Sequence, residues 1–259
     1  MHKELFRFQL PDYFATLFHT KWLIIYTYAF CIVLGIILGT LYTKWNARKT
    51  LGVELPNTFI YLIFTAGFIG GKIFYFIENP SYFWNHLSLL LNIFSGGFVF
   101  YGSFVTIIFV VIWYLKKHNI EVLPMLDILA ITTIILQILG RTGCFFAGCC
   151  YGLPTNSTFG VVFPTSNHLT VHPTQLYEVF ILLLIVTFLL IINIHKQFQG
   201  QIFLLYISLY GICRIILEFF RGDTRGFIIK DTLSHSQFIA TIILLIALLF
   251  YKKLKQKTI

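Results

Sequence analysis

The sequence predicts an all-α integral membrane protein that crosses the bilayer about seven times. Of its 259 residues, 58% are hydrophobic and 11% are charged, whereas a soluble domain carries about a quarter charged residues. The apolar residues form long blocks, and a helix of about 18 or more such residues can cross some 30 Å of hydrocarbon. Basic residues fall on alternate connections between these blocks, which is typical of a chain that passes repeatedly through a membrane.

Seven spanning helices are expected within one transmembrane domain that covers residues 1–259. The start of the chain lacks the compact apolar run and the small-residue cleavage site of a signal peptide, so the first helix is expected to stay in the membrane. The aromatic connection between the second and third helices fits either an interfacial segment or a plain loop. Apolar length places the helices at 22–43, 57–77, 98–115, 124–141, 174–194, 201–219 and 235–251.

The basic residues also predict the orientation of the chain. Connections 78–97 and 142–173 contain no Lys or Arg. Cytoplasmic loops carry an excess of Lys and Arg, so the N-terminus is expected outside and the C-terminus inside. The net charge of +9 comes from these basic residues, which are expected to act as topology signals and to contact anionic headgroups. No nucleic acid is expected as a partner. The basic residues on the inner side are Lys44, Arg48, Lys49, Lys116, Lys117, Lys196, Lys252, Lys253, Lys255 and Lys257.

The densest group of ionisable residues lies on the sixth predicted helix and its outer end. Tyr210, Arg214, Glu218 and Arg221 are spaced four, four and three residues apart, which places them on one face of a helix. A charge at mid-helix costs about 2.5–3.5 kcal/mol on insertion scales, so charges there usually mark function. Two guanidiniums flanking a carboxylate suit a phosphate, which Arg binds in bidentate fashion. The alternative is a buried ion pair that only locks helices together.

Two further segments place polar groups at the same outer side. The glycine-rich segment 140–152 begins with Gly140 and Arg141, and its four glycines allow the backbone to turn and approach a ligand. The alternative is that this segment is only a tight connection between helices, with an arginine at the membrane interface. The second segment carries His172, Gln175 and Glu178 around the start of the fifth helix, where free N–H groups can bind an anionic headgroup.

The cysteines of the glycine-rich segment have three open interpretations. Cys144, Cys149 and Cys150 are either packing residues or a disulfide pair in an oxidising compartment. They otherwise form a metal site with His172, although the spacing matches no common zinc pattern. The third interpretation is a thiolate nucleophile favoured by the neighbouring Arg141.

These segments together resemble the bacterial phosphatidylglycerol–prolipoprotein diacylglyceryl transferases. The resemblance rests on Gly140-Arg141-x-Gly143, on His172-Pro-x-Gln-Leu-Tyr-Glu178, and on Tyr210-Gly-x-x-Arg214-x-x-x-Glu218-x-x-Arg221. The Gly67-to-Lys72 element, Tyr101-Gly102-Ser103 and the Ser234–Gln237 start of the seventh helix also fit.

The resemblance implies an enzyme of the bacterial cytoplasmic (inner) membrane with its active site facing the outer leaflet. Such an enzyme moves a diacylglyceryl group from phosphatidylglycerol to the thiol of a lipobox cysteine in a prolipoprotein signal peptide and releases glycerol phosphate. No metal and no organic cofactor are implied.

The resemblance also implies roles for individual residues. Arg141 and Arg214 would bind and activate the lipid phosphate, and a tyrosine of the first helix, Tyr26 or Tyr28, would lie nearby. The catalytic set is Arg141, Arg214, Cys149, Tyr101 and His172. The substrate-binding set is Tyr28, Lys72, Gly102, Gly143, Cys144, Gln175, Glu178, Tyr210, Glu218 and Arg221. From the residues alone, Lys72 either faces the cavity or snorkels outward.

The chain departs from the usual family signature at three of these positions. The signature has an asparagine at the position of Cys144, an acidic residue at Cys149 and a histidine at Tyr101. Two alternatives therefore stay open. One is a divergent enzyme with Cys149 or Cys150 as its own nucleophile and another acceptor. The other is a non-catalytic protein that binds or transports phospholipid.

Overall fold

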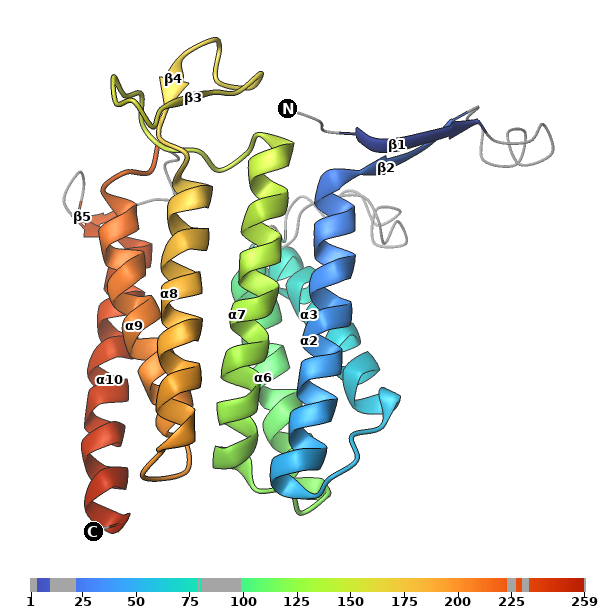
Figure 1. Cartoon of the computed structure of the whole chain (residues 1–259), viewed down its shortest axis with the longest axis vertical. Coiled ribbons are helices and arrows are strands. Elements are labelled where there is room, and N and C mark those ends of the chain that lie inside the picture. Colours follow the sequence, from blue (N-terminus) through green and yellow to red (C-terminus); the bar gives the residue numbers. More distant parts are fainter. Residues whose placement is uncertain are drawn as a thin grey trace. The chain divides into compact units, whose positions relative to one another are not determined.

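The computed structural model describes residues 4–9, 22–78, 80, 99–222, 227–229 and 233–258, and its described part contains a helix at each of the seven predicted places (Figure 1). Six of these helices are long and apolar enough to cross a membrane. The prediction of an all-α polytopic membrane protein is thereby confirmed. The helices are α2 (Thr27–Leu51), α3 (Asn57–Glu78), α6 (Phe100–Lys117), α7 (Val122–Ala147), α8 (Thr174–Ile194), α9 (Gln201–Glu218) and α10 (His235–Thr258).

Several helix ends differ from the prediction, and α2 and α10 end eight and seven residues later than predicted, at Leu51 and Thr258. The first helix begins at Thr27, because Trp22–Tyr26 form a strand, β2, that pairs antiparallel with β1 (Glu4–Gln9). The large aromatic and β-branched side chains of Trp22–Tyr26 favour an extended backbone. Helix α7 continues six residues past the predicted end at 141, because Gly143 packs within the helix against α2 and does not turn the chain.

The helices belong to two compact units, residues 1–43 with 126–259 and residues 44–125. In the first unit, α7, α8 and α9 share one apolar core, and α10 packs against α9. The buried residues of the shared core are Ala130, Ile131, Ile134, Leu182, Ile185, Leu189, Ile202 and Tyr206. The expectation of one domain over residues 1–259 stays a prediction.

The intramembrane carboxylate Asp127 caps a helix in the first unit. It accepts the backbone N–H groups of Gly200 and Phe203, each at 2.9 Å, and Lys196 lies 3.5 Å away. The first N–H groups of α9 have no partner inside the helix, and the helix dipole favours a negative charge there. Asp127 therefore holds α7 to the start of α9.

The start of α10 carries a reciprocal capping arrangement. The Ser234 hydroxyl accepts the N–H of Gln237 at 3.1 Å, and the Gln237 side chain accepts the N–H of Ser234 at 3.1 Å. Two helix-end donors are satisfied in this way, as in a capping box. Three short antiparallel pairings complete the secondary structure of the described residues: β1 with β2, β3 (Val161–Val162) with β4 (Thr170–Val171), and β5 (Phe227–Ile229) with β6 (Leu233–Ser234).

In the second unit, α3 and α6 pack closely at their glycines. A Cβ atom at Gly70 would overlap the Thr106 hydroxyl and lie 2.7 Å from the Gly102 carbonyl oxygen. A Cβ at Gly102 would lie 2.5 Å from the Gly70 carbonyl oxygen. The small-residue spacing around Lys72 predicted such close packing, and Gly102 has a structural role here. The aromatic connection 81–98 lies outside the described residues.

We expect Gly70→Ala to lower the free energy of unfolding by about 1–3 kcal/mol, because the added methyl group forces the two helix backbones apart. The measurement is the midpoint of unfolding in a denaturing detergent, followed by tryptophan fluorescence. Gly140→Ala is the matched control, since its Cβ would meet its nearest neighbour at 3.8 Å. Equal midpoints for the two variants would contradict the close contact.

Candidate functional site

A buried ion network joins three helices in the first unit. Glu178 on α8 has only 2% of its side chain exposed. It accepts the Nε–H of Arg141 on α7 at 2.9 Å and the hydroxyl of Tyr210 on α9 at 3.0 Å. Three residues from separate predicted motifs therefore meet at one carboxylate, and Tyr210 bonds to Glu178 and not to its own helix.

A second ion pair follows one turn along α9. The Arg214 Nη2 atom lies 3.4 Å from Glu218 Oε2, an i,i+4 pair. The Arg214 Nη1 atom and Glu218 Oε2 are buried without a hydrogen-bond partner among the described residues. Buried donors in native proteins are almost always satisfied. An unsatisfied guanidinium donor therefore points to a ligand that supplies the missing acceptor.

The two arginines act on the same part of the site. Both Arg141 and Arg214 lie close enough to Tyr210 to interact electrostatically with it. Two polar residues of the same network escaped the sequence analysis: Tyr206 stacks on Tyr210 with ring centroids 5.9 Å apart, and its hydroxyl donates to Gln137 at 3.0 Å. The signal was available for Tyr206, which lies four residues before Tyr210 on the predicted stripe.

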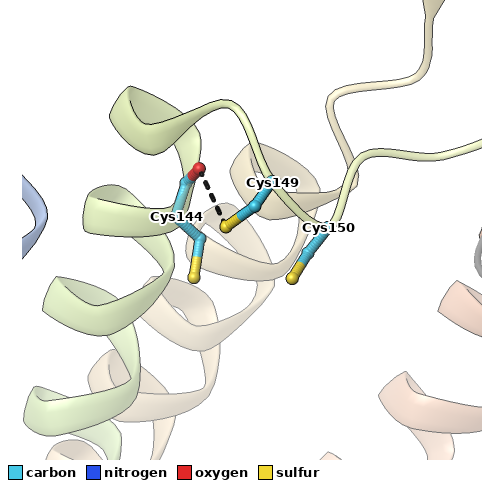
Figure 2. Close-up of side chains that lie close together, drawn as sticks. All are labelled: Cys144, Cys149 and Cys150. Carbon is cyan, nitrogen blue, oxygen red and sulfur yellow. Dashed lines mark hydrogen bonds between the residues drawn. The ribbon is translucent and has the colours of Figure 1, made fainter. Parts of the chain in front are cut away.

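The end of α7 brings two cysteines together. Gly148 has a φ of 69°, the N–H of Gly148 bonds to the Phe145 carbonyl at 3.1 Å, and the N–H of Cys149 bonds to the Cys144 carbonyl at 3.2 Å. These two bonds and a left-handed glycine define a Schellman motif. The chain thereby folds back, and the Cys149 thiol lies 3.7 Å from the Cys144 carbonyl oxygen (Figure 2).

Cys150 completes a group of three thiols. Its φ of 63° is a left-handed conformation that only a few per cent of non-glycine residues adopt. The sulfur atoms of Cys144, Cys149 and Cys150 all lie within 4.8 Å of one another (Figure 2). All three cysteines are free thiols.

Side chains in the first turn of α8 hydrogen-bond to the backbone of this thiol cluster. The Thr174 hydroxyl donates to the Cys150 carbonyl at 2.9 Å, and the Gln175 amide donates to the Cys149 carbonyl at 2.6 Å. Both side chains are almost fully buried. Gln175 thus contacts the glycine-rich segment, while its Oε1 atom is buried without a partner among the described residues.

The thiol cluster has an uneven charge distribution. A hydrogen bond from the Cys144 thiol, together with the charges of Arg141 and Arg221, lowers the pKa of the Cys150 thiol to about 5. Burial raises the pKa of Cys149, and the negative charge of Cys150 raises it further. Among the three thiols, ionisation is therefore most favoured at Cys150, one residue beyond the cysteine that sequence reasoning placed in the catalytic set.

Backbone pairing holds the remaining predicted residues of this unit near the thiol cluster. Gly152 forms a bridge with the buried Arg221, and its N–H bonds to the His172 carbonyl at 2.8 Å. The His172 Nδ1 atom lies 3.1 Å from the Tyr177 hydroxyl. His172 therefore lies where the segment after α7 pairs with residues next to the start of α8 and the end of α9.

Tyr28 is the tyrosine of the first helix that approaches the site. A Cβ atom at Gly143 would lie 3.1 Å from the Tyr28 ring, so Gly143 makes room for that ring against α7. The Tyr28 ring interacts electrostatically with the thiol cluster, whereas Tyr26 is the last residue of β2. Lys72, Tyr101 and Gly102 belong to the second unit, and the side chain of Tyr101 lies outside the described residues.

We expect Glu178→Ala to lower the free energy of unfolding by about 3–5 kcal/mol, because it leaves the Arg141 charge without its partner. Tyr210→Phe removes one hydrogen bond to a charged acceptor and should cost about 1.5–3 kcal/mol. Detergent-induced unfolding of both variants beside the wild type measures the difference. A larger loss for Tyr210→Phe would contradict a network centred on the carboxylate.

Known proteins are similar in sequence to this chain over almost its whole length. The family model of prolipoprotein diacylglyceryl transferase matches residues 15–252. A phosphatidylglycerol–prolipoprotein diacylglyceryl transferase of Clostridium tetani is 35% identical over 241 residues, which are 91% of this chain and 95% of the relative. One from Clostridium perfringens is 32% identical over 90% of this chain and 92% of its own length.

A more distant relative with the same name, from Finegoldia magna, is 31% identical over 238 residues, covering 90% of this chain and 92% of the relative. The matches cover almost the full length of each protein, so these sequences do not differ by the gain or loss of a whole domain. The match spans both units and includes every motif on which the ion network and the thiol cluster depend. The chain belongs to the prolipoprotein diacylglyceryl transferase family.

Proposed function

We propose that this protein transfers the diacylglyceryl group of phosphatidylglycerol to the thiol of a lipobox cysteine in a prolipoprotein signal peptide. The names of its relatives support this activity and both substrates. The distribution of basic residues supports an N-terminus outside, a C-terminus inside and an active site at the outer leaflet of the bacterial cytoplasmic membrane. Nucleic acid has no part in this proposal.

The observation that carries the proposal is the Nη1 donor of Arg214, which is buried without a hydrogen-bond partner among the described residues. It is buried beside a carboxylate and lies close to the Glu178 network. A lipid phosphate offers several strong acceptor oxygens, and the planar fork of Arg binds such oxygens in bidentate fashion. Binding of the phosphodiester would satisfy the donor and place the lipid at the end of α9.

Arg141 would complete the phosphate site. Glu178 engages its Nε–H, which orients the guanidinium, and the two terminal nitrogens carry further donors that a phosphate can accept. In the reaction the acceptor thiol loses its proton to water, and its sulfur bonds to the glycerol carbon of the diacylglyceryl group. The bond between that carbon and the phosphate oxygen breaks, and glycerol phosphate leaves with the electron pair. Cations fixed at this oxygen stabilise the charge that builds up there.

The acceptor would approach from the thiol-cluster side. Cys149, His172 and Tyr28 lie around the end of α7 with Gly143 and Cys144, and we assign Tyr101 and Lys72 to the acceptor and lipid as the family resemblance implies. Glu218 and Arg221 would organise the phosphate site from the end of α9.

The direct test uses the purified protein in detergent with phosphatidylglycerol and a lipobox peptide. We expect glycerol phosphate release to equal the amount of peptide that gains the diacylglyceryl mass, and both to vanish in Arg141→Ala. Release without modified peptide would show another acceptor. Lipid that binds without any release would show a non-catalytic protein and contradict the proposal.

The proposed bidentate role of Arg214 predicts a larger loss of activity on its removal than on removal of Lys72. Arg214→Ala should lower kcat/KM by about 10²–10³, the loss seen when one donor to a developing oxyanion is removed. Lys72→Ala should cost far less, since a lysine provides no bidentate contact. Steady-state release of glycerol phosphate measures both, with Arg214→Lys as the variant that keeps the charge and loses the fork. Equal losses for Arg214→Ala and Lys72→Ala would exclude this division of roles.

A further inference from the structure

The three thiols at the end of α7 are spaced for a single metal ion. The sulfur atoms of Cys144, Cys149 and Cys150 all lie within 4.8 Å of one another. Three thiolates bound to one zinc ion at about 2.3 Å are about 3.8–4.0 Å apart. The upper limit of the observed separations exceeds this spacing by only about 1 Å.

A disulfide would engage only two of these three thiols. Adjacent cysteines have Cα atoms about 3.8 Å apart, which is shorter than the usual separation of about 4.4–6.8 Å for a bridge, so a Cys149–Cys150 bond is unfavourable. A bridge from Cys144 to either neighbour leaves the third thiol outside it. A metal ion is the partner that engages all three sulfur atoms, and soft thiolate ligands select zinc and other thiophilic ions.

The surrounding residues support such a site without using the sulfur atoms. Thr174 and Gln175 hold the carbonyl groups of Cys150 and Cys149, and the Thr165 hydroxyl donates to the Gly148 carbonyl. The segment is thus fixed by its backbone, and the side chains converge from it (Figure 2). Ligand orientation by such surrounding hydrogen bonds is a regular feature of protein metal sites.

The local charge also suits a thiolate complex. Three thiolates and one divalent cation have a net charge of −1. Arg141 and the buried Arg221 both act electrostatically on the thiol cluster. Their positive charge offsets the anionic complex in a place where an uncompensated charge would be costly.

We propose that Cys144, Cys149 and Cys150 bind one thiophilic divalent metal ion, of which Zn²⁺ is the representative, and that the fourth coordination position receives the acceptor thiol. Three protein ligands with an open fourth position are typical of catalytic zinc sites. The role of the fourth position rests on the proposed function, because it requires that the acceptor is a cysteine.

Coordination would prepare the acceptor for the transfer. A thiol bound to such an ion loses its proton outright, here to water. The bound sulfur then forms a bond to the glycerol carbon while the carbon–oxygen bond to phosphate breaks. The electron pair leaves with glycerol phosphate, and the metal keeps its oxidation state. The thioether product carries no negative charge, so it binds the ion more weakly and can depart.

The first experiment measures metal content. The full chain is purified in detergent under reducing conditions, loaded with Zn²⁺, freed of loosely bound ions and analysed by elemental mass spectrometry. We expect wild-type protein to retain zinc in a ratio of about one per chain, as a single site requires. Cys144→Ala, Cys149→Ala and Cys150→Ala should each retain at least about tenfold less.

Cys213→Ala is the matched control, because Cys213 is a buried thiol on α9 outside the cluster. It should retain as much zinc as the wild type. Wild-type protein that retains no more zinc than the three cluster variants would overturn the proposal, and so would an equal loss in Cys213→Ala. A disulfide between two cluster cysteines in all of the protein isolated without reductant would also overturn it.

The second experiment tests the open position. Protein loaded with Co²⁺ should show thiolate-to-cobalt absorption, and a lipobox peptide should change that absorption. The same peptide with serine in place of cysteine should not. A spectrum that both peptides leave unchanged would overturn the acceptor role.

The failure of this inference and the failure of the proposed function give different results. Transfer at an unchanged rate by zinc-free wild-type protein would overturn the role of the metal and leave the transferase activity established. Zinc retention and a peptide-dependent cobalt spectrum without any transfer would support the metal site and refute the proposed function.

Discussion

The burial of one carboxylate, Glu178, sets the arrangement of the residues around the site. An isolated carboxylate in a nonpolar interior is costly, and it persists there only when partners supply charge and hydrogen bonds. Glu178 finds these partners on two other helices, in Arg141 of α7 and Tyr210 of α9. The pairing therefore fixes the register of three helices. Asp127 makes the equivalent connection between α7 and the start of α9.

The apolar core between these two carboxylates cannot set the register by itself. Leu182, Ile185 and Leu189 of α8 face Ile131 and Ile134 of α7, and such side chains pack with small loss in alternative positions. Inside a membrane, lipid tails are as apolar as the core, so helices gain little from burying apolar surface against each other. Directional contacts at the ends of the helices therefore carry the specificity of packing.

The sequence predicted the features that depend on local composition. Long apolar blocks placed all seven helices, and spacing placed Tyr210, Arg214 and Glu218 on one face. Two other features depended on neighbours that are distant in the chain. Helix α7 continues through Gly143 because the Tyr28 ring packs there. Tyr210 bonds to Glu178 because α8 and α9 are adjacent. No local pattern indicates either contact.

The thiol cluster shows how a helix end joins two functions in one place. Arg141 and Cys144 are three residues apart, so they are neighbours on one face of α7, and the Schellman motif then returns Cys149 to the same end. One helix would thus position both the cation proposed to bind the lipid phosphate and a sulfur of the proposed metal site. Because both depend on the same helix turn, displacement of Gly143 from Tyr28 would disturb the phosphate and the thiols together. Such coupling suits a transfer reaction, in which the leaving oxygen and the attacking sulfur must be aligned on one carbon atom.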